Sequence, residues 1–536
     1  MDATPNLFQA WYDSREQLAN ALKNYQDTSL ALGNLITPRS SETFGSGALE
    51  DLFAAISLEL SHAPLKDEQR IVARAALRRV VNRNTKVVCI SVLPDEILVR
   101  IFSLITSGRC SFFPFADREV EGCPIMTTTL AITHVCAGWR ALAINTPSLW
   151  SHLDVVDEGL RREPGQGLSE YLDRLWLERA GNTPLALQVT RECDIVKLYQ
   201  HGEMTELVPH FENLHSLGVQ ANSLNSILAM LSYWVHISEA PRALRELVIA
   251  GRKGRSYINV KYTSPQLDFF FNKPHFRSLK VLRIRHTAFD IDWFKFAWPP
   301  LVHLELIAIP TKASPSKSVL LHALMNLPEL QVLKLQDVDL IRGEDLDINT
   351  VDLNHLKRLE LIELRSDMCS FLLSVIRPGP GELMLRLESR IESDILRSFL
   401  EGLNVTKLYI KPTRLYFLDA LTTIKDLRTL VIDFNDSVDS CESTLKLLLP
   451  AAESGTSGTS THRWSNLRAL WLIESEIEAD FFKTIIQDYR PEVAILSLTD
   501  CLWDKADRDE VLAVVLRLVR ERVLHRMDIE DWYNRC

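Results

Sequence analysis

The chain has 536 residues, of which 46% are hydrophobic and 24% are charged. This composition is ordinary for a globular protein and excludes wholesale disorder, and the length suits several domains or one long repetitive domain. The formal net charge of −10 disfavours a dedicated nucleic-acid binder, which usually carries a basic domain. We therefore expect no nucleic-acid partner.

The first region, residues 1–86, is predicted to be a helical N-terminal region. Apolar residues recur there at helical spacing and predict three helices, over residues 14–35, 48–61 and 66–82. In the third of these, Arg70, Arg74 and Arg78 follow one another at intervals of four residues on one face. This basic ladder is either a solvated helix face or a contact for an acidic partner.

The second region, residues 87–155, is short and dense in apolar residues. Segment 94–96, Pro-Asp-Glu, forms a favourable N-terminus for a first helix whose apolar stripe continues to Ile105. The threonines at 127–129 can cap a second helix, which the sequence Asn-Thr-Pro at 145–147 ends. A helix pair of this size is too small to bury all of its apolar surface. That surface must be covered by the rest of the chain or by a partner protein.

The same segment resembles an F-box. It has an opening Leu-Pro-x-Glu at 93–96, a central Val-Cys-x-x-Trp-Arg at 135–140 and a closing Leu-Trp at 149–150, in the order of that family's motif. The resemblance implies binding to a Skp-type adaptor and, through it, to a cullin ubiquitin-ligase scaffold. The residues that it implies for adaptor binding are Leu93, Pro94, Ile97, Leu98, Ile101, Phe102, Val135, Trp139, Leu149 and Trp150. The segment departs from the family in a long insertion at 107–126, which would cover part of the adaptor surface or mask it.

The third region, residues 156–536, is repetitive. The pattern LxxLxL, with Ile or Val allowed at some positions, returns about every 28 residues, within the range of leucine-rich repeats. Its occurrences begin at Leu214, Leu244, Leu279, Leu301, Leu330, Leu356, Val405, Leu427, Leu467 and Val493, and more weakly at Leu524, while Leu383, Leu385 and Leu387 fill the widest gap. Residues 151–156 and 183–189 are candidates for earlier strands of the same sheet.

Each LxL core predicts a short strand with one buried face, and stacked units bury together what one unit cannot. The segments between the strands supply helices, predicted over residues 222–234, 318–327, 393–403 and 479–489. The region resembles the leucine-rich-repeat family, but its units vary in length and lack the Asn or Cys expected after the strand. We expect an α/β fold in which the helical N-terminal region and the F-box helices precede an irregular, helix-backed solenoid of parallel strands. A small-residue segment at 451–463 is predicted to be a flexible loop.

The target-binding surface is predicted from the alternation of side chains along each strand. Residues that flank the buried leucines point to the opposite, concave face, which repeat solenoids use for binding. We expect a target to meet an excess of positive charge and two exposed aromatic residues there, at Arg283, Arg285, Lys334, Arg358, Lys407, Tyr409 and Trp471. Such a surface would suit an acidic or phosphorylated segment.

Motifs for catalysis and for metal or cofactor binding are absent from the sequence. We find no phosphate loop, no GxGxxG, no GxSxG and no HExxH. The nine cysteines are odd in number and contain no CxxC pair, which excludes a zinc-module spacing and suits a reducing compartment. No run approaches about 18 uncharged apolar residues, and the N-terminus does not resemble a signal peptide. We therefore expect no catalytic residue, cofactor, metal or membrane partner, in the cytoplasm and/or the nucleus.

The function predicted from these patterns is that of a substrate-recognition subunit in a Skp–cullin–F-box ubiquitin ligase. The F-box-like domain would bind the adaptor, and the repeats would bind an unidentified target protein. Because such a subunit acts by raising the local concentration of its target, it needs no catalytic site of its own. The alternative is a leucine-rich-repeat scaffold that binds a protein without any ligase.

Overall fold

The computed structural model describes the chain in segments. They are residues 4–35, 51, 54–56, 90, 93–106, 124–156, 168–190, 208–221, 227–228, 231–232, 234–235, 244–251, 274–287, 300–309, 314–340, 350–411, 418–421, 423–434, 467, 469–473 and 495–499. The chain divides into two compact units. One consists of Met1–Leu153 and Leu168–Thr183, and the other of Asp154–Gly167 and Pro184–Cys536.

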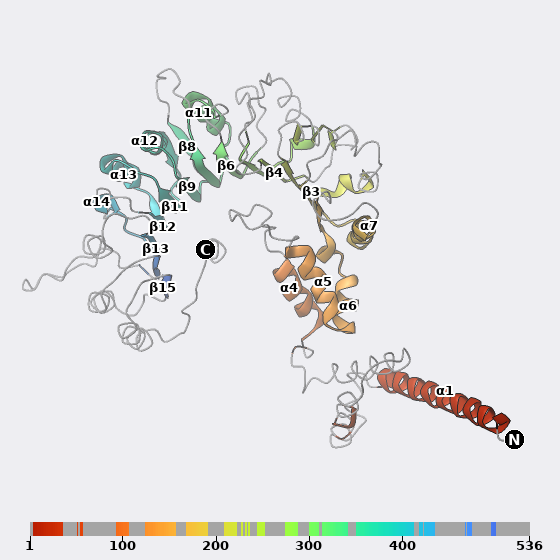
Figure 1. The fold of residues 1–536 in the computed structure, drawn as a ribbon. Helices are drawn as coiled ribbons and strands as arrows, with labels where there is room; N and C mark the ends of the chain where they lie inside the picture. The colour runs from red at the N-terminus through yellow and green to blue at the C-terminus, as the bar shows by residue number, and fades with distance from the viewer. Residues whose placement is uncertain are drawn as a thin grey trace, which may run out of the picture. The chain divides into compact units, whose positions relative to one another are not determined.

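The first unit is helical (Figure 1). Its elements are α1 (Thr4–Leu35), α4 (Asp95–Thr106), α5 (Pro124–Val135), α6 (Ala137–Ile144), the 3-10 helix η3 (Pro147–Trp150) and α7 (Leu168–Ala180). The helix predicted over 14–35 is confirmed and begins earlier, at Thr4. The predicted helix 48–61 is described only at residues 51 and 54–56, which are helical. The predicted helix 66–82 with its arginine ladder lies outside the described residues. Of the insertion predicted at 107–126, residues 107–123 also lie outside them, and residues 124–126 form the start of α5.

The helix predicted to run from 127–129 to 145 is wrong as a single element, because the chain forms two helices that meet at Cys136. The backbone of Cys136 is extended, with φ −157° and ψ 169°, and its Sγ accepts a hydrogen bond from the amide of Trp139. Cys136 therefore acts as the N-cap of α6 and interrupts the helix. The predicted stop is confirmed, since Asn145 caps the C-terminus of α6.

The second unit is built on an extended sheet. Among the described residues, thirteen strands pair in the order β1-β2-β3-β4-β5-β6-β7-β9-β11-β12-β13-β14-β15. The pairs that join β2 through to β15 are all parallel. The strands are β1 (His152–Val156), β2 (Leu185–Thr190), β3 (Leu214–Ala221), β4 (Glu246–Gly251), β5 (Val281–Arg285), β6 (His303–Ile309), β7 (Val332–Val338), β9 (Arg358–Ile362), β11 (Glu382–Glu388), β12 (Asn404–Ile410), β13 (Thr429–Asp433), β14 (Ala469–Ile473) and β15 (Ile495–Thr499). The α/β class with a parallel sheet is therefore confirmed.

The repeated leucines account for this sheet. In most units the strand begins two residues after the first leucine of the pattern, and the later two leucines lie side by side with those of the next strand. Leu282 of β5 lies beside Leu304 of β6, which in turn lies beside Leu333 of β7. These three side chains are at most 1% exposed. The unit predicted at 524–529 and the loop predicted at 451–463 lie outside the described residues.

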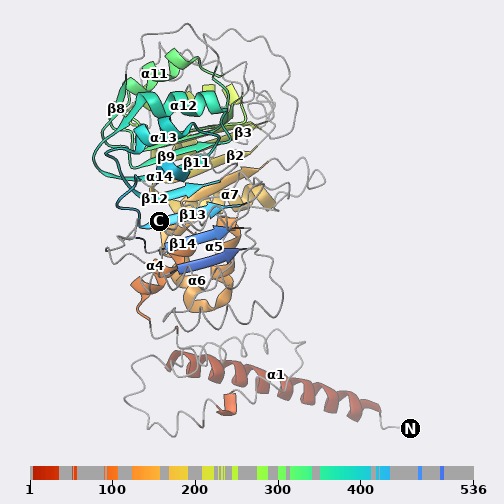
Figure 2. The ribbon, with the colours of Figure 1, turned by 90° about the vertical axis from the view of Figure 1, so that its left-hand side faces the viewer.

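Helices follow one another along one face of the sheet, as Figures 1 and 2 show from two sides. They are α11 (Lys317–Met325), α12 (Ser366–Val375), α13 (Ser393–Leu400) and α14 (Leu418–Leu421). The helices predicted over 318–327 and 393–403 are confirmed as α11 and α13, whereas α12 and α14 were not predicted. A second, two-stranded parallel sheet of β8 (Val351–Leu353) and β10 (Ile376–Pro378) was also not predicted.

A backbone feature recurs at the C-terminal ends of four neighbouring strands, within the last two residues of β6 and β7 and directly after β5 and β9. His286, Ala308, Asp337 and Glu363 all have φ near +50°, in the left-handed region. Each follows a residue of the register-matched set Arg285, Ile307, Gln336 and Ile362. The chain therefore repeats not only its leucines but also the same backbone turn at equivalent positions.

Candidate functional site

The first candidate surface is an apolar stripe on α4, formed by Ile97, Ile101, Leu104 and Ile105. Ile97 is 47% exposed, Leu104 60% and Ile105 54%, and Ile101 is half-buried. Their spacing places them along one side of the helix. Such a row of exposed large apolar side chains indicates an interaction surface more than an ordinary solvated helix.

Further exposed apolar residues lie near the ends of the neighbouring helices. Val135, the last residue of α5, is 58% exposed, and Ile144, the last residue of α6, is 37% exposed. Pro94 is also exposed, and Leu93 is half-buried. The exposed members of the implied adaptor set are therefore Pro94, Ile97 and Val135.

Four residues of the implied adaptor set are buried and form the core of the helical unit. Leu98 and Phe102 lie on the inner side of α4, and Leu149 and Trp150 lie in η3. The implied role of these four residues as surface contacts is corrected. Leu98 and Phe102 face inward because of their helical spacing on α4, and Leu149 and Trp150 are covered by other helices. Trp139 is half-buried, and its ring lies 4.7 Å from that of Phe102.

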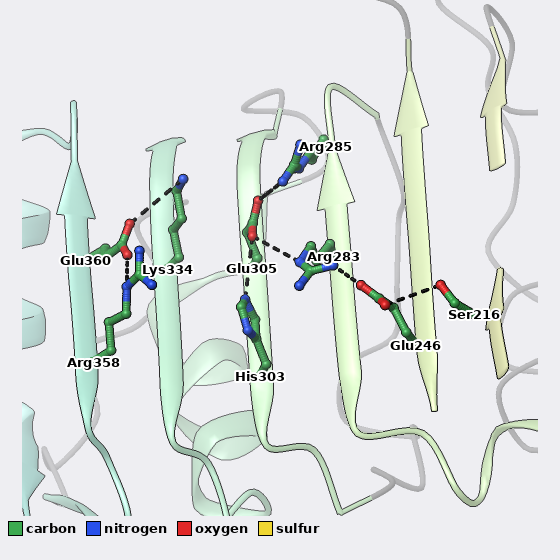
Figure 3. A network of polar contacts seen from close by, with 9 residues as sticks. All are labelled: Ser216, Glu246, Arg283, Arg285, His303, Glu305, Lys334, Arg358 and Glu360. Carbon is green, nitrogen blue, oxygen red and sulfur yellow. Dashed lines mark hydrogen bonds and ion pairs between the residues drawn. The ribbon is translucent and has the colours of Figure 1, made fainter. Parts of the chain in front are cut away.

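The second candidate surface is the charged face, which we define as the sheet face that carries Arg283, Glu305, Lys334, Glu360 and Arg386. In the sheet register each of these residues is paired with the next, across β5, β6, β7, β9 and β11. Positive and negative side chains therefore alternate along one row of five strands. Figure 3 shows the first four of them, Arg283, Glu305, Lys334 and Glu360. Figure 3 also shows that these side chains lie on the side of the strands opposite the helix behind them.

Glu305 is the most strongly held acid of this row. Its carboxylate lies 2.6 Å from Nη2 of Arg285, 3.4 Å from Nε of Arg283 and 3.5 Å from Nε2 of His303. Burial by itself would raise the pKa of Glu305, but the hydrogen bond with His303 and the charges of Arg285, Lys334 and Arg283 outweigh it and hold that pKa well below its usual range. Glu305 is therefore a buried, ionised centre of the face.

Ion pairs continue on both sides of Glu305. Glu246 pairs with Arg283 and accepts a hydrogen bond from the hydroxyl of Ser216 at 3.2 Å. Glu360, which is fully buried, pairs with Arg358 and lies 3.8 Å from Nζ of Lys334. Burial lowers the pKa of Lys334 although Glu305 and Glu360 act in the opposite direction. Beyond this point Arg386 pairs with Glu388.

The face becomes aromatic where the charged row ends. Tyr409, Val431 and Trp471 continue the same register row on β12, β13 and β14. They pack with Met384 and Ala469 into what we call the aromatic cluster. Figure 1 shows that β12 and β13 lie next to each other at this end of the sheet.

The prediction that Tyr409 and Trp471 are exposed is wrong. Tyr409 is 1% exposed and Trp471 7% exposed. The hydroxyl of Tyr409 donates to Oδ2 of Asp433 at 2.6 Å, and the guanidinium of Arg386 lies 4.4 Å from the centre of the Tyr409 ring. The alternation predicted the correct side of the strand, but packing between neighbouring strands removes both rings from the surface.

The predicted excess of positive charge on this face is also corrected. Arg283, Arg285, Lys334 and Arg358 do lie on the predicted side, and Lys407 is half-buried on the same side between Met384 and Thr429 in the register. Acidic residues lie on the same face and bind the first four. The face is therefore charge-balanced, and its arginines hold the sheet's own carboxylates.

Sequence reasoning missed several residues of the charged face, although the alternation in β11 would have found two of them. Arg386 and Glu388 flank the buried Leu387 in the same way as the predicted residues flank theirs. Glu246 precedes the first leucine of its strand core, and Asp433 follows the last apolar residue of β13. These acids were missed because the prediction weighted only basic and aromatic side chains.

Comparison with known proteins assigns no family to the chain. No protein-family model matches the chain, and no curated protein matches its sequence. Within the part of the chain that the structure describes, no helix is both long enough and apolar enough to cross a membrane.

Proposed function

We propose that the chain is the substrate-recognition subunit of a Skp–cullin–F-box ubiquitin ligase. In this proposal α4, α5 and α6 bind a Skp-type adaptor, the parallel sheet and its helices form a leucine-rich-repeat solenoid, and the protein acts in the cytoplasm or the nucleus. The alternative that would remain without adaptor binding is a repeat scaffold with no ligase.

The observation that carries the adaptor part is the apolar stripe on α4. Ile97, Leu104 and Ile105 expose large apolar side chains on a helix that opens the F-box-like motif. Burial of one such side chain in an interface contributes about 1.5–3 kcal/mol. The resemblance of the motif at 93–150 and the exposure of this stripe support the same partner.

The solenoid part is supported by the repetition in the second unit. Equivalent leucines lie side by side in successive strands, and the left-handed turn returns at His286, Ala308, Asp337 and Glu363. Repeats of this kind are expected when each unit buries its leucines against the next one. The helices on one face leave the charged face for a target.

For target binding we propose the accessible cations of the charged face. Lys334 and Arg358 pair with Glu360 and keep 18% and 20% of their side-chain surface exposed. Arg283 and Arg285 pair with Glu305 and are less exposed, at 12% and 14%. We therefore assign target contact to Lys334, Arg358 and the half-buried Lys407, and a structural role to Arg283 and Arg285. Affinity purification of an Arg358→Met/Lys407→Met variant should recover less target at unchanged adaptor recovery.

The adaptor part is tested by calorimetric titration of the full-length chain with a purified Skp-type adaptor. An Ile97→Asp variant places a charge in the stripe and should weaken binding at least about tenfold, as for an interface anchor. Met325→Asp is the matched control, since Met325 is 48% exposed on α11. A folded wild-type chain that does not bind the adaptor, or an Ile97→Asp variant that binds as the wild type does, would refute the ligase function and leave the scaffold.

A further inference from the structure

Trp150 is held by a set of contacts that the F-box-like motif does not include. Its side chain is fully buried, and its indole Nε1 donates to the carbonyl of Ala143 at 2.8 Å. The ring of Trp176 meets it edge-on, with ring centres 4.5 Å apart. The guanidinium of Arg179 lies 4.3 Å from the centre of a Trp150 ring. Trp176 and Arg179 both belong to α7, which begins 18 residues after Trp150.

The short helix η3 carries Trp150 and lies among the helices α4 to α7. It contacts α4, α5, α6 and α7. The hydroxyl of Thr129 in α5 donates to the carbonyl of Ile125 at 2.9 Å and reaches that of Leu149 at 3.4 Å. The bond from Trp150 to Ala143 reaches the last turn of α6, directly before the exposed Ile144. The position of η3 therefore affects where the exposed apolar residues of α6 lie.

We propose that α7 is part of the adaptor-binding unit and that Arg179 and Trp176 are its positioning residues. They hold Trp150, and through it the C-terminal end of α6, in the arrangement that presents the apolar surface. This inference rests on the proposed function for its partner. The division of the chain supports it, since Leu168–Thr183 falls into the same compact unit as α4, α5 and α6, although the domain boundary predicted at 155 had assigned it to the repeats.

A cation over a tryptophan face is attracted by the ring's negative quadrupole, and the attraction is lost when the charge is removed. Arg179→Met keeps most of the side-chain length and removes the charge. Arg179→Lys keeps a cation and is the rescue variant. Arg174→Met is the matched control, because Arg174 lies on the same helix but is 65% exposed and pairs with Glu178 across one turn.

The experiment measures adaptor affinity of the full-length variants by titration, at a temperature where circular dichroism shows each of them to be fully folded. Arg179→Met should weaken binding about two- to fivefold, as expected for loss of a partly exposed cation–π contact. Arg179→Lys should bind within about twofold of the wild type, and Arg174→Met should bind as the wild type does. Because only folded protein is compared, a loss of stability alone would leave the affinity unchanged.

Amide hydrogen exchange on the same variants gives a readout that needs no adaptor. Arg179→Met should speed exchange at residues 141–151 relative to Arg174→Met, since the contact that holds η3 is weakened. Wild-type affinity together with wild-type exchange in Arg179→Met would overturn the positioning role. Absence of adaptor binding by the wild type, with faster exchange in Arg179→Met, would refute the proposed function and retain α7 as the clamp of the helical unit.

Discussion

Replacement of Glu305 by glutamine tests whether the charged face is a compensated ion network. Only 3% of the Glu305 side chain is exposed, and Arg283 and Arg285 beside it are 12% and 14% exposed. Glutamine keeps the shape of the side chain but leaves these cations buried without their shared counter-charge. Removal of one member of a buried ion pair costs about 3–5 kcal/mol, because the remaining charges stay desolvated.

The assay is urea-induced unfolding followed by circular dichroism, and the matched control is Glu382→Gln on the same sheet. Glu382 also pairs with an arginine, Arg428, at 2.8 Å, but the two side chains are 57% and 46% exposed. The control should change the free energy of unfolding by less than about 1 kcal/mol, because water screens an exposed pair. Equal and small effects of both substitutions would refute the assignment of Glu305 as the buried centre of the network.

The same comparison has a defined pH dependence. The pKa of Glu305 is lower in the folded chain than in the unfolded chain, where glutamate titrates near about 4.3. Its stabilising contribution is therefore complete above the unfolded value and is lost as the pH falls toward the folded value. The difference in stability between the wild type and Glu305→Gln should therefore shrink as the pH falls below about 4.3. A difference that grows on acidification would contradict the lowered pKa.

Three further substitutions test the repeat backbone and the aromatic cluster by the same unfolding assay. Ala308→Gly should stabilise the sheet unit by about 0.5 kcal/mol, because a left-handed φ of 49° strains alanine but not glycine; a loss of stability would argue against this turn. Gly251→Ala should cost about 1–3 kcal/mol, since the added Cβ would lie 2.0 Å from the carbonyl oxygen of His286, and a neutral effect would contradict that close approach. Tyr409→Phe should cost about 1–3 kcal/mol by removing the hydrogen bond to the buried Asp433, and an unchanged midpoint would place the hydroxyl in water.

Sequence periodicity predicted the strands of the sheet well, because the position of each strand and its buried face are specified by the leucines within that strand. In β5 the alternation of Leu282 and Ile284 with Arg283 and Arg285 determines which side chains share a face, whatever the neighbouring strands contain. The first helix of the F-box-like segment was predictable for the same reason, since its apolar stripe is local. The break at Cys136 was not predictable from periodicity, because the apolar positions continue at helical spacing across it.

Exposure and pairing depend on residues that are distant in sequence, and only the tertiary structure decides them. Tyr409 faces the predicted side of its strand, yet it is buried because Val431 and Trp471, from later strands, pack beside it. Arg283 appears in the sequence as a free cation, but the register brings Glu305 next to it from a strand 22 residues further along.

Trp150 shows the same limit in the helical unit. The sequence by itself determined the class of the fold, the spacing of the repeated leucines and the positions of the strands that they form. The tertiary structure decided that Trp150 is a core residue, because α7 returns to cover it with Trp176 and Arg179. The local alternation of apolar and polar residues specifies which way a side chain points. Its burial and the pairing of its charge depend on which other segments of the chain pack beside it in the folded protein.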